Sequence, residues 1–184
     1  MKIALYLGSF NPFHNDHLRL VKEALLEFGM DRVVIVPTMQ NPWKEEEVLD
    51  MNKRIQIIVR SCFEMIHKPH PHYTCGNSPL YEWITISNIE KDLIPPYYSY
   101  ATLHALKNKY CNDEIFILCG EDTIEEIPDW MLGEQIIKDY NFLVCDRPEN
   151  SISSTEIRNR IKNNENIEEL VSTSVINLVS RLYR

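Results

Sequence analysis

The stretch Gly8-Ser9-Phe10-Asn11-Pro12-Phe13-His14-Asn15-Asp16-His17 determines how the rest of the chain is interpreted. The apolar run before it, residues 3–7, predicts a buried strand because it is short and ends at a glycine. After it, Leu18, Val21 and Leu25 recur at helical spacing. The stretch is therefore predicted to be a strand–loop–helix junction, with a glycine at the turn and histidines where the helix starts.

The two histidines of this stretch suggest a phosphate site. His14 and His17 are three residues apart, which places both on one face of the first helical turn. A helix N-terminus adds free backbone N–H groups and the positive end of the helix dipole, and both favour an anion. This combination suits a polyphosphate, although a strand–turn–helix with two surface histidines remains the alternative.

A second motif, Ile152-Ser153-Ser154-Thr155-Glu156-Ile157-Arg158, follows a predicted strand over residues 142–145. Ser153 and Glu156 have the spacing of a capping box, and capping alone would explain part of the motif. Hydroxyl groups, free N–H groups and Arg158 one turn later would also form a second phosphate cradle.

Together the two motifs resemble those of the nicotinamide/nicotinate mononucleotide adenylyltransferases, in the His-x-x-His nucleotidyltransferase superfamily. The first reads Gly-Ser-Phe-Asn-Pro-x-x-x-x-His-Leu-Arg-Leu here, and the second matches Ile-Ser-x-Thr-x-Ile-Arg. The resemblance implies adenylyl transfer from ATP to nicotinate or nicotinamide mononucleotide, forming the (deamido-)NAD dinucleotide and pyrophosphate. Many members have glycine where this chain has Asp16, which brings negative charge near the expected phosphates.

The resemblance also implies site residues. It assigns catalysis to His14, His17 and Arg158. It assigns ATP binding to strand ends and helix starts, namely Gly8, Ser9, Phe10, His14, His17, Gly120, Asp122, Ser153, Ser154, Thr155 and Arg158. It assigns the pyridine nucleotide to Ser9, Phe10, Lys44, Tyr100, Ala101 and Trp130. No metal site made of protein ligands is predicted, and Mg²⁺ is expected to arrive with ATP.

Gly120 and Asp122 follow a predicted buried strand over residues 114–119. Glycine lets the backbone approach a ligand, and a carboxylate at a strand end can accept hydrogen bonds from ribose hydroxyls. The alternative is that Asp122 caps the following helix. Trp130 matches the family tryptophan that stacks on the pyridine ring, and the alternative for it is core filling.

The remaining pattern predicts a Rossmann-like, doubly wound parallel α/β sheet of about five strands, and the resemblance implies that it is of the nucleotidyltransferase type. Further strands are predicted over residues 32–36 and 84–89, with helices over residues 50–66 and from Ser99. A dinucleotide-binding redox domain is disfavoured, because no Gly-x-Gly-x-x-Gly follows the first strand.

Arg54 has two interpretations. It stands where the family often has an arginine or a histidine, or it forms a salt bridge in contact with solvent. Asn164 is expected to replace the left-handed glycine at a helix end.

Length and composition indicate one domain over residues 1–184, and the resemblance implies that it is a nucleotidyltransferase domain. The net charge of −8 argues against nucleic acid as a partner. No membrane-spanning run or signal peptide is apparent, so a cytoplasmic protein without a membrane partner is expected.

The five cysteines form no Cys-x-x-Cys pair, and the His67 to His72 tract is not favoured as a metal site. The oligomeric state stays open, a homo-oligomer included.

Two other classes of function remain. One is another His-x-x-His transferase, such as a phosphopantetheine adenylyltransferase or a cytidylyltransferase, against which Gly-x-Asp followed by Trp130 argues. The other is a nucleotide-binding protein without catalysis, which Asp16 and Glu168 keep open, since Glu168 stands where the family has arginine. The sequence does not distinguish nicotinate from nicotinamide.

Overall fold

The structure is a computed structural model that describes residues 1–39, 48–67, 82–148 and 150–184. Its centre is a parallel sheet of five strands in the order β3-β2-β1-β4-β5. The strands are β1 (Lys2–Gly8), β2 (Arg32–Pro37), β3 (Ile84–Ile86), β4 (Glu114–Gly120) and β5 (Asn141–Cys145). This order confirms the predicted doubly wound sheet, because the chain adds β2 and β3 on one side of β1 and then β4 and β5 on the other.

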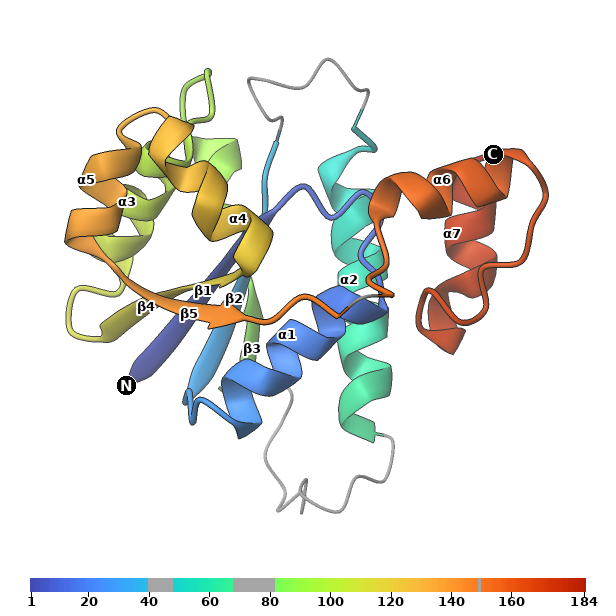
Figure 1. Cartoon of the computed structure of the whole chain (residues 1–184), viewed down its shortest axis with the longest axis horizontal. Helices are drawn as coiled ribbons and strands as arrows, with labels where there is room; N and C mark the ends of the chain where they lie inside the picture. The colour runs from blue at the N-terminus through green and yellow to red at the C-terminus, as the bar shows by residue number, and fades with distance from the viewer. Residues whose placement is uncertain (40–47, 68–81, 149) are drawn as a thin grey trace.

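Helices connect the strands and lie on both sides of the sheet (Figure 1). The α-helices are α1 (Asn15–Leu26), α2 (Met51–His67), α3 (Ser99–Lys109), α4 (Glu121–Glu126), α5 (Gly133–Asp139), α6 (Ser154–Lys162) and α7 (Ile176–Leu182). Short 3₁₀ helices are η2 (Ile89–Asp92), η3 (Ile127–Asp129) and η4 (Thr173–Val175). No described helix is both long enough and apolar enough to cross a membrane.

Alternation along the strands divides the core in two. On β1, Ala4 and Tyr6 point to one cluster, whereas Ile3 and Leu5 point to the other. The first cluster contains buried residues of α1, α2, α6 and α7, and the second contains residues of α3, α5 and η3. The central strands β1 and β2 are therefore buried on both faces, which explains why residues 3–6 and 33–36 read as continuous apolar runs in the sequence.

The order in which the chain adds strands reverses at β1, which pairs with β2 on one side and with β4 on the other. This position is the topological switch point of the sheet. β1 ends at Gly8 and β4 ends at Gly120, so both carboxyl ends lie at the same edge. In doubly wound sheets, ligands bind in the crevice that opens at this point. The two glycines that the sequence singled out therefore lie at the expected position for a ligand.

One predicted strand is shorter than expected. The alternation over residues 84–89 predicts six residues, but β3 covers only Ile84–Ile86. The Ser87 N–H still bonds to the carbonyl of Ile35 at 2.9 Å. The Ser87 hydroxyl then accepts the N–H of Ile89 at 3.4 Å, which turns the chain into η2.

Candidate active site

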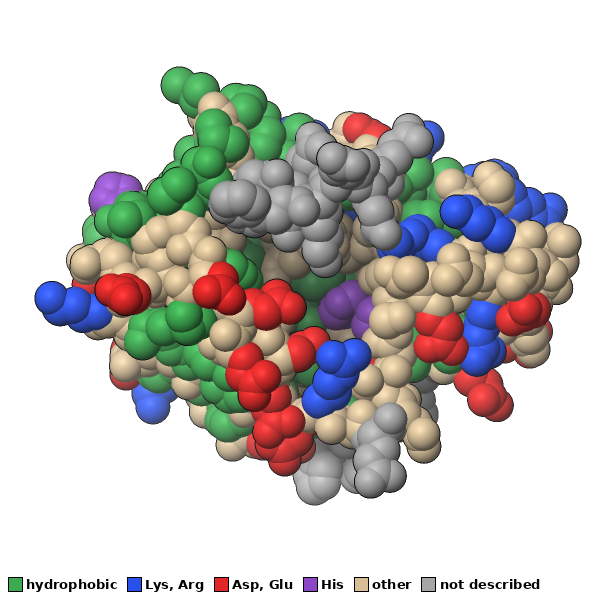
Figure 2. All heavy atoms as spheres, turned by 45° about the horizontal axis from the view of Figure 1, so that its top comes forward, with side chains coloured by type: hydrophobic (Ala, Val, Ile, Leu, Met, Phe, Trp, Pro, Cys, Tyr) green, Lys and Arg blue, Asp and Glu red, His purple; other side chains and the backbone are tan. Residues whose placement is uncertain are grey.

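A cavity of about 370 Å³ lies at the edge of the sheet where β1 and β4 end, between the start of α1 and the start of α6. A histidine is visible in a hollow of the surface, with basic and acidic side chains beside it (Figure 2). The cavity is lined by all the residues predicted to bind ATP: Gly8, Ser9, Phe10, His14, His17, Gly120, Asp122, Ser153, Ser154, Thr155 and Arg158. The fold thus brings together motifs that are far apart in sequence.

The two histidines form one stacked unit. Their ring centroids are 3.6 Å apart with an angle of 26° between the planes, and Phe13 stacks on His17 at 5.2 Å. His14 is the residue that precedes α1, and its N–H donates to Nδ1 of His17 at 3.2 Å. Because His17 satisfies a free backbone donor at the helix start, its ring is fixed in orientation.

Burial keeps both imidazoles neutral. It lowers the pKa of His14 to about 3, and it lowers the pKa of His17 well below its usual value, with the neighbouring His14 adding to the effect. His14 is only 5% exposed, and its Nδ1 has no hydrogen-bond partner within the described residues. A buried polar atom of this kind is costly, so a ligand acceptor facing the cavity would satisfy it.

Phe10 shapes the loop between β1 and α1. It adopts a left-handed φ of 46°, and its side chain is 2% exposed among Tyr6, Phe13 and His17. A Cβ on Gly8 would lie 2.8 Å from the Phe10 ring, so glycine is required for the ring to fold back. With its side chain turned into the core, Phe10 can serve a ligand mainly through its backbone.

The loop is also held by Arg54, which is 1% exposed. Its guanidinium donates to the carbonyls of Ser9 at 2.5 Å and Leu49 at 2.7 Å. The alternative of a solvent salt bridge is therefore wrong. Asn11, on the same loop, accepts from the Tyr183 hydroxyl at 2.8 Å through its side-chain oxygen.

Ser153 caps α6, with its hydroxyl accepting the N–H of Glu156 at 3.1 Å. The carboxylate of Glu156 pairs with Arg160 at 2.7 Å, one turn along the helix. The capping interpretation is correct for Ser153, while the Glu156 side chain binds along the helix. Capping accounts for one hydroxyl of the motif and leaves the others to be explained.

Two further side chains of α6 bind the first motif. Ser154 donates its hydroxyl to the carbonyl of Pro12 at 2.9 Å, and Arg158 donates to the carbonyl of Asn11 at 2.8 Å. Arg158 also donates to the hydroxyl of Thr155 at 3.2 Å. The two motifs are therefore in direct contact, with hydroxyl and guanidinium groups at the cavity between them.

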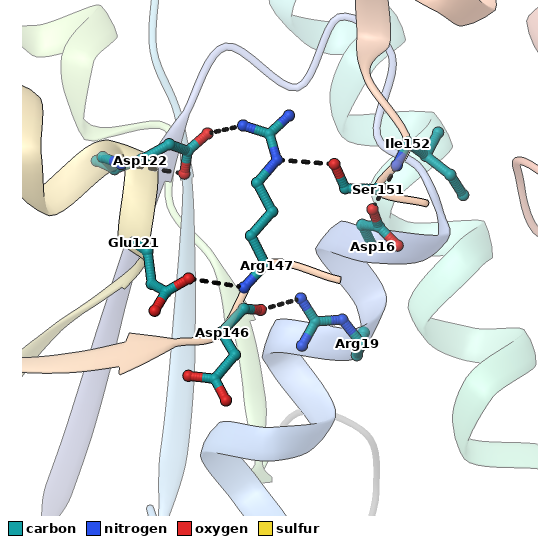
Figure 3. Close-up of polar contacts among 9 residues, drawn as sticks. Asp16, Arg19, Glu121, Asp122, Asp146, Arg147, Ser151 and Ile152 are labelled. Carbon is teal, nitrogen blue, oxygen red and sulfur yellow. Dashed lines mark hydrogen bonds and ion pairs between the residues drawn. The ribbon is translucent and has the colours of Figure 1, made fainter. Parts of the chain in front are cut away.

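Asp122 lies in the first turn of α4, and Figure 3 shows its carboxylate facing the loop after β5. One oxygen accepts the N–H of Thr123 at 3.0 Å, and the other pairs with Arg147 at 2.7 Å. A Cβ on Gly120 would come within 2.8 Å of the Asp122 carboxylate. Glycine at the strand end thus makes room for the carboxylate, and the helix cap itself is Gly120.

The sequence interpretation missed Arg147. Besides Asp122, it binds Glu121 through its backbone N–H at 3.2 Å and the Ser151 hydroxyl through Nε at 2.7 Å (Figure 3). It lines the cavity. Its position could have indicated a role in binding, because it follows the carboxyl end of β5 by two residues. Doubly wound sheets bind ligands at the carboxyl ends of their strands.

Of the residues predicted for the pyridine nucleotide, Ser9 and Phe10 line the cavity, but three others are not brought together with them. Tyr100 and Ala101 lie at the start of α3 and Trp130 follows η3, and none of the three lines the cavity. Tyr100 and Trp130 pack instead against the core cluster on the other face of the sheet. Lys44 and most of the His67 to His72 tract lie outside the described residues.

Two other sequence features can be placed. Asn164 has a left-handed φ of 56° just after α6, as expected for the residue replacing glycine. Glu168, which stands where the family has arginine, does not line the cavity. The described residues contain no group of three or more His, Cys, Asp or Glu placed to hold a metal.

The comparisons agree with this geometry. The model of the cytidylyltransferase-like family matches residues 5–160. A Flavobacterium johnsoniae protein named "Probable nicotinate-nucleotide adenylyltransferase" is 32% identical, covering 95% of this chain and 94% of the relative. The nicotinate-nucleotide adenylyltransferase of Bacillus subtilis strain 168 is 26% identical, covering 95% and 93%.

A solved structure shares the fold. The Plasmodium falciparum nicotinic acid mononucleotide adenylyltransferase complexed with NaAD aligns with a TM-score of 0.73 at 16% identity, over 99% of this chain and 97% of that one. Because the family model spans most of the chain and a relative is 32% identical along nearly its full length, the chain belongs to the nicotinate-nucleotide adenylyltransferase family of nucleotidyltransferase enzymes.

Proposed function

We propose that the protein transfers the adenylyl group of ATP to nicotinate or nicotinamide mononucleotide, forming the (deamido-)NAD dinucleotide and pyrophosphate. One observation carries this proposal: the stacked pair of His14 and His17 and the phosphate motif of α6 line a single cavity at the switch point of the sheet. Two anion sites facing one another suit a substrate with a chain of phosphates.

The reaction needs positioning more than acid–base chemistry. The 5′-phosphate of the mononucleotide is largely dianionic at neutral pH, so it can act as nucleophile without a general base. A bond forms between one of its oxygens and the α-phosphorus of ATP, the bond from that phosphorus to the β-phosphate oxygen breaks, and pyrophosphate leaves. Catalysis then consists of alignment and of stabilising charge on the transferring group.

The residues of the cavity divide this task. His14 and His17 would donate to the α-phosphate, which would satisfy the Nδ1 of His14, an atom without a partner among the described residues. Ser153, Ser154, Thr155 and Arg158 would hold the β- and γ-phosphates. The backbone of Gly8, Ser9 and Phe10 would approach the nucleotide, and Asp122 beside Gly120 would accept a ribose hydroxyl in exchange for Arg147.

The pyridine nucleotide would bind next to this cavity. Leu7 lines the cavity and also packs against the apolar cluster that includes Tyr100 and Trp130. Aromatic side chains on this cluster are suited to stack on a flat ring. We therefore keep Trp130 as the stacking residue, and as further residues for the pyridine nucleotide those that the family resemblance implies, namely Ser9, Phe10, Lys44, Tyr100 and Ala101.

Mg²⁺ would enter as part of the substrate Mg–ATP. Phosphate oxygens are preferred ligands of this hard cation, which usually keeps several waters. We expect excess chelator to abolish pyrophosphate release, and excess Mg²⁺ to restore it fully. Full activity in chelator would contradict this proposal.

The function is tested by incubating the protein with Mg–ATP and, separately, nicotinate mononucleotide, nicotinamide mononucleotide or phosphopantetheine. Pyrophosphate release is followed and the product identified. A dinucleotide from either pyridine substrate supports the proposal, and the ratio of the two rates gives the specificity. Activity only with phosphopantetheine, or ATP binding without pyrophosphate release, would refute it.

A further inference from the structure

Asp16 joins the two phosphate motifs directly. It lies in the first turn of α1, between His14 and His17, and its Oδ2 accepts the N–H of Ile152 at 2.6 Å (Figure 3). The two residues are 136 positions apart in the sequence. Asp16 is half-buried and lines the cavity.

The donor of this hydrogen bond, the N–H of Ile152, lies at a sensitive point of the second motif. Ile152 immediately precedes Ser153, the cap of α6, so the position of its backbone sets where the free N–H groups of α6 point. The Asp16 contact runs from the helix that carries the histidines to the first residue of this motif. Together with the bonds from Ser154 and Arg158 to the first motif, it fixes the distance between the two groups of phosphate donors.

Neighbouring contacts hold the rest of the same loop. Arg19, one turn after Asp16, donates to the carbonyl of Asp146 at 2.8 Å. Arg147 binds Ser151 at 2.7 Å. These bonds anchor the loop before Ile152, which leaves Asp16 as the α1 side chain bonded at the start of the motif itself.

The presence of an aspartate at position 16 indicates that this side chain positions the second motif. A carboxylate in a phosphate cavity repels the substrate, so its charge alone opposes ATP binding. The same charge strengthens its hydrogen bond to a backbone N–H and is favourable at a helix N-terminus. Glycine, which many family members have here, offers no side-chain acceptor for the N–H of Ile152.

We propose that Asp16 is a positioning residue, which sets the α6 phosphate motif at the correct distance from His14 and His17 and thereby tunes the binding of ATP. The proposal deepens the proposed function and rests on it for the identity of the triphosphate ligand. Asp16 acts through Ile152 and touches none of the reacting atoms.

Three variants separate the hydrogen bond from the charge. In Asp16→Ala the acceptor is lost, and we expect the KM for ATP to rise about tenfold, the effect of one hydrogen bond to a charged group. The KM for the pyridine nucleotide should stay within about twofold, because the change lies at the triphosphate end. Asp16→Asn keeps an oxygen acceptor without the charge, so its KM for ATP should equal or fall below that of the wild type. Asp16→Glu keeps the charge but displaces the acceptor, so its KM should rise.

Asp31→Ala is the matched control. The carboxylate of Asp31 also accepts a backbone N–H, that of Lys2 at 2.7 Å, at the opposite edge of the sheet. This variant should leave the KM for ATP unchanged. A wild-type KM in Asp16→Ala, or equal impairment in the Asn and Ala variants, would overturn the proposal.

Calorimetric titration of each variant with Mg–ATP alone keeps the two proposals distinct. If the wild type releases no pyrophosphate with any acceptor, the proposed function fails, while the ratio of ATP dissociation constants still tests Asp16. If Asp16→Ala does not fold by circular dichroism, the comparison of Asp16→Asn with Asp16→Glu decides, and equal affinities in these two would overturn the positioning role.

Discussion

At the scale of single residues, His17 has both a structural and a chemical task. Its Nδ1 accepts the N–H of His14, while its ring lines the cavity. We expect His17→Ala to lower turnover by about 10²–10³, the usual effect of losing one transition-state donor. The rate of pyrophosphate release at saturating substrates measures this, and normal turnover would refute the catalytic assignment.

A second substitution separates the two tasks. Asparagine in His17→Asn can still accept the N–H of His14, because its side-chain oxygen reaches as Nδ1 does. We expect its melting temperature to be above that of His17→Ala, with turnover equally low. If turnover recovers together with stability, the histidine acts only as a cap.

The buried histidines make stability depend on pH. The pKa of His14 falls from 6.5 to about 3 on folding, so below pH 6.5 only the unfolded chain binds this proton. The free energy of unfolding should then decrease by about 1.4 kcal/mol per pH unit for this group, down to about pH 3. The contribution is fully present above pH 6.5.

Urea unfolding at pH 7 and pH 5 tests this, with His14→Asn as the control because asparagine does not titrate. Between these two pH values the wild type should lose about 2 kcal/mol more than the variant. Equal losses would show that His14 titrates normally in the folded protein. Saturating ATP should reduce the difference, because phosphate favours the protonated imidazole.

At the scale of residues, the sequence predicted which residues line the cavity better than it predicted their hydrogen-bond and ion-pair partners. All the predicted ATP residues line one cavity because they sit at strand ends and helix starts, which are readable from apolar runs. The pairing of Asp122 with Arg147 and of Asp16 with Ile152 was not readable, because both join segments that only the sheet order brings together. Trp130 was predicted from a motif, which gives no information on which face of the sheet its side chain packs.

At the scale of elements, the loop between β1 and α1 is a packed structure. A Cβ added to Gly8 would lie 2.8 Å from Cε1 and 2.9 Å from Cζ of Phe10, a buried ring without room to move. We expect Gly8→Ala to destabilise the protein by about 1–3 kcal/mol and to distort the site. Thermal unfolding and pyrophosphate release measure the two effects.

Gly29→Ala is the comparison for this substitution. Gly29 has a φ of +63° and nothing within 4 Å of an added Cβ, so alanine there meets strain but no clash. A cost of about 1–2 kcal/mol in stability is expected, with the specific activity of the folded protein unchanged. If Gly8→Ala behaves in the same way, the Phe10 contact is not needed for activity.

Element types were predicted well because both faces of the sheet are covered. Burial makes the central residues of β1, β2 and β4 a continuous apolar run, a signal that survives without knowledge of tertiary contacts. The end of β3 was not readable, because it depends on the hydroxyl of Ser87 competing for the N–H of Ile89. A serine in an alternating run fits a strand equally well.

At the scale of the whole molecule, the segment after α6 supports the loop after β1. The Tyr183 hydroxyl donates to Asn11 at 2.8 Å, and the N–H of Leu49 binds the same oxygen at 3.2 Å. We expect Tyr183→Phe to lower the free energy of unfolding by about 1 kcal/mol, since the Leu49 bond remains. Urea unfolding measures this, and the KM for ATP should rise only a few fold. An unchanged stability would indicate that the hydroxyl has no net effect.

The contacts between the two motifs also determine at which point of synthesis the active site can be completed. Residues 8–17 are made before their partners. Ile152 is 136 positions from Asp16, and Arg158 and Tyr183 are 147 and 172 positions from Asn11. On the ribosome, the histidine loop must therefore wait for β5 and α6 to emerge before its phosphate site is complete. A nascent chain that stalls before α6 has the histidines but lacks the triphosphate cradle, so it would neither hold ATP in line nor form a dinucleotide.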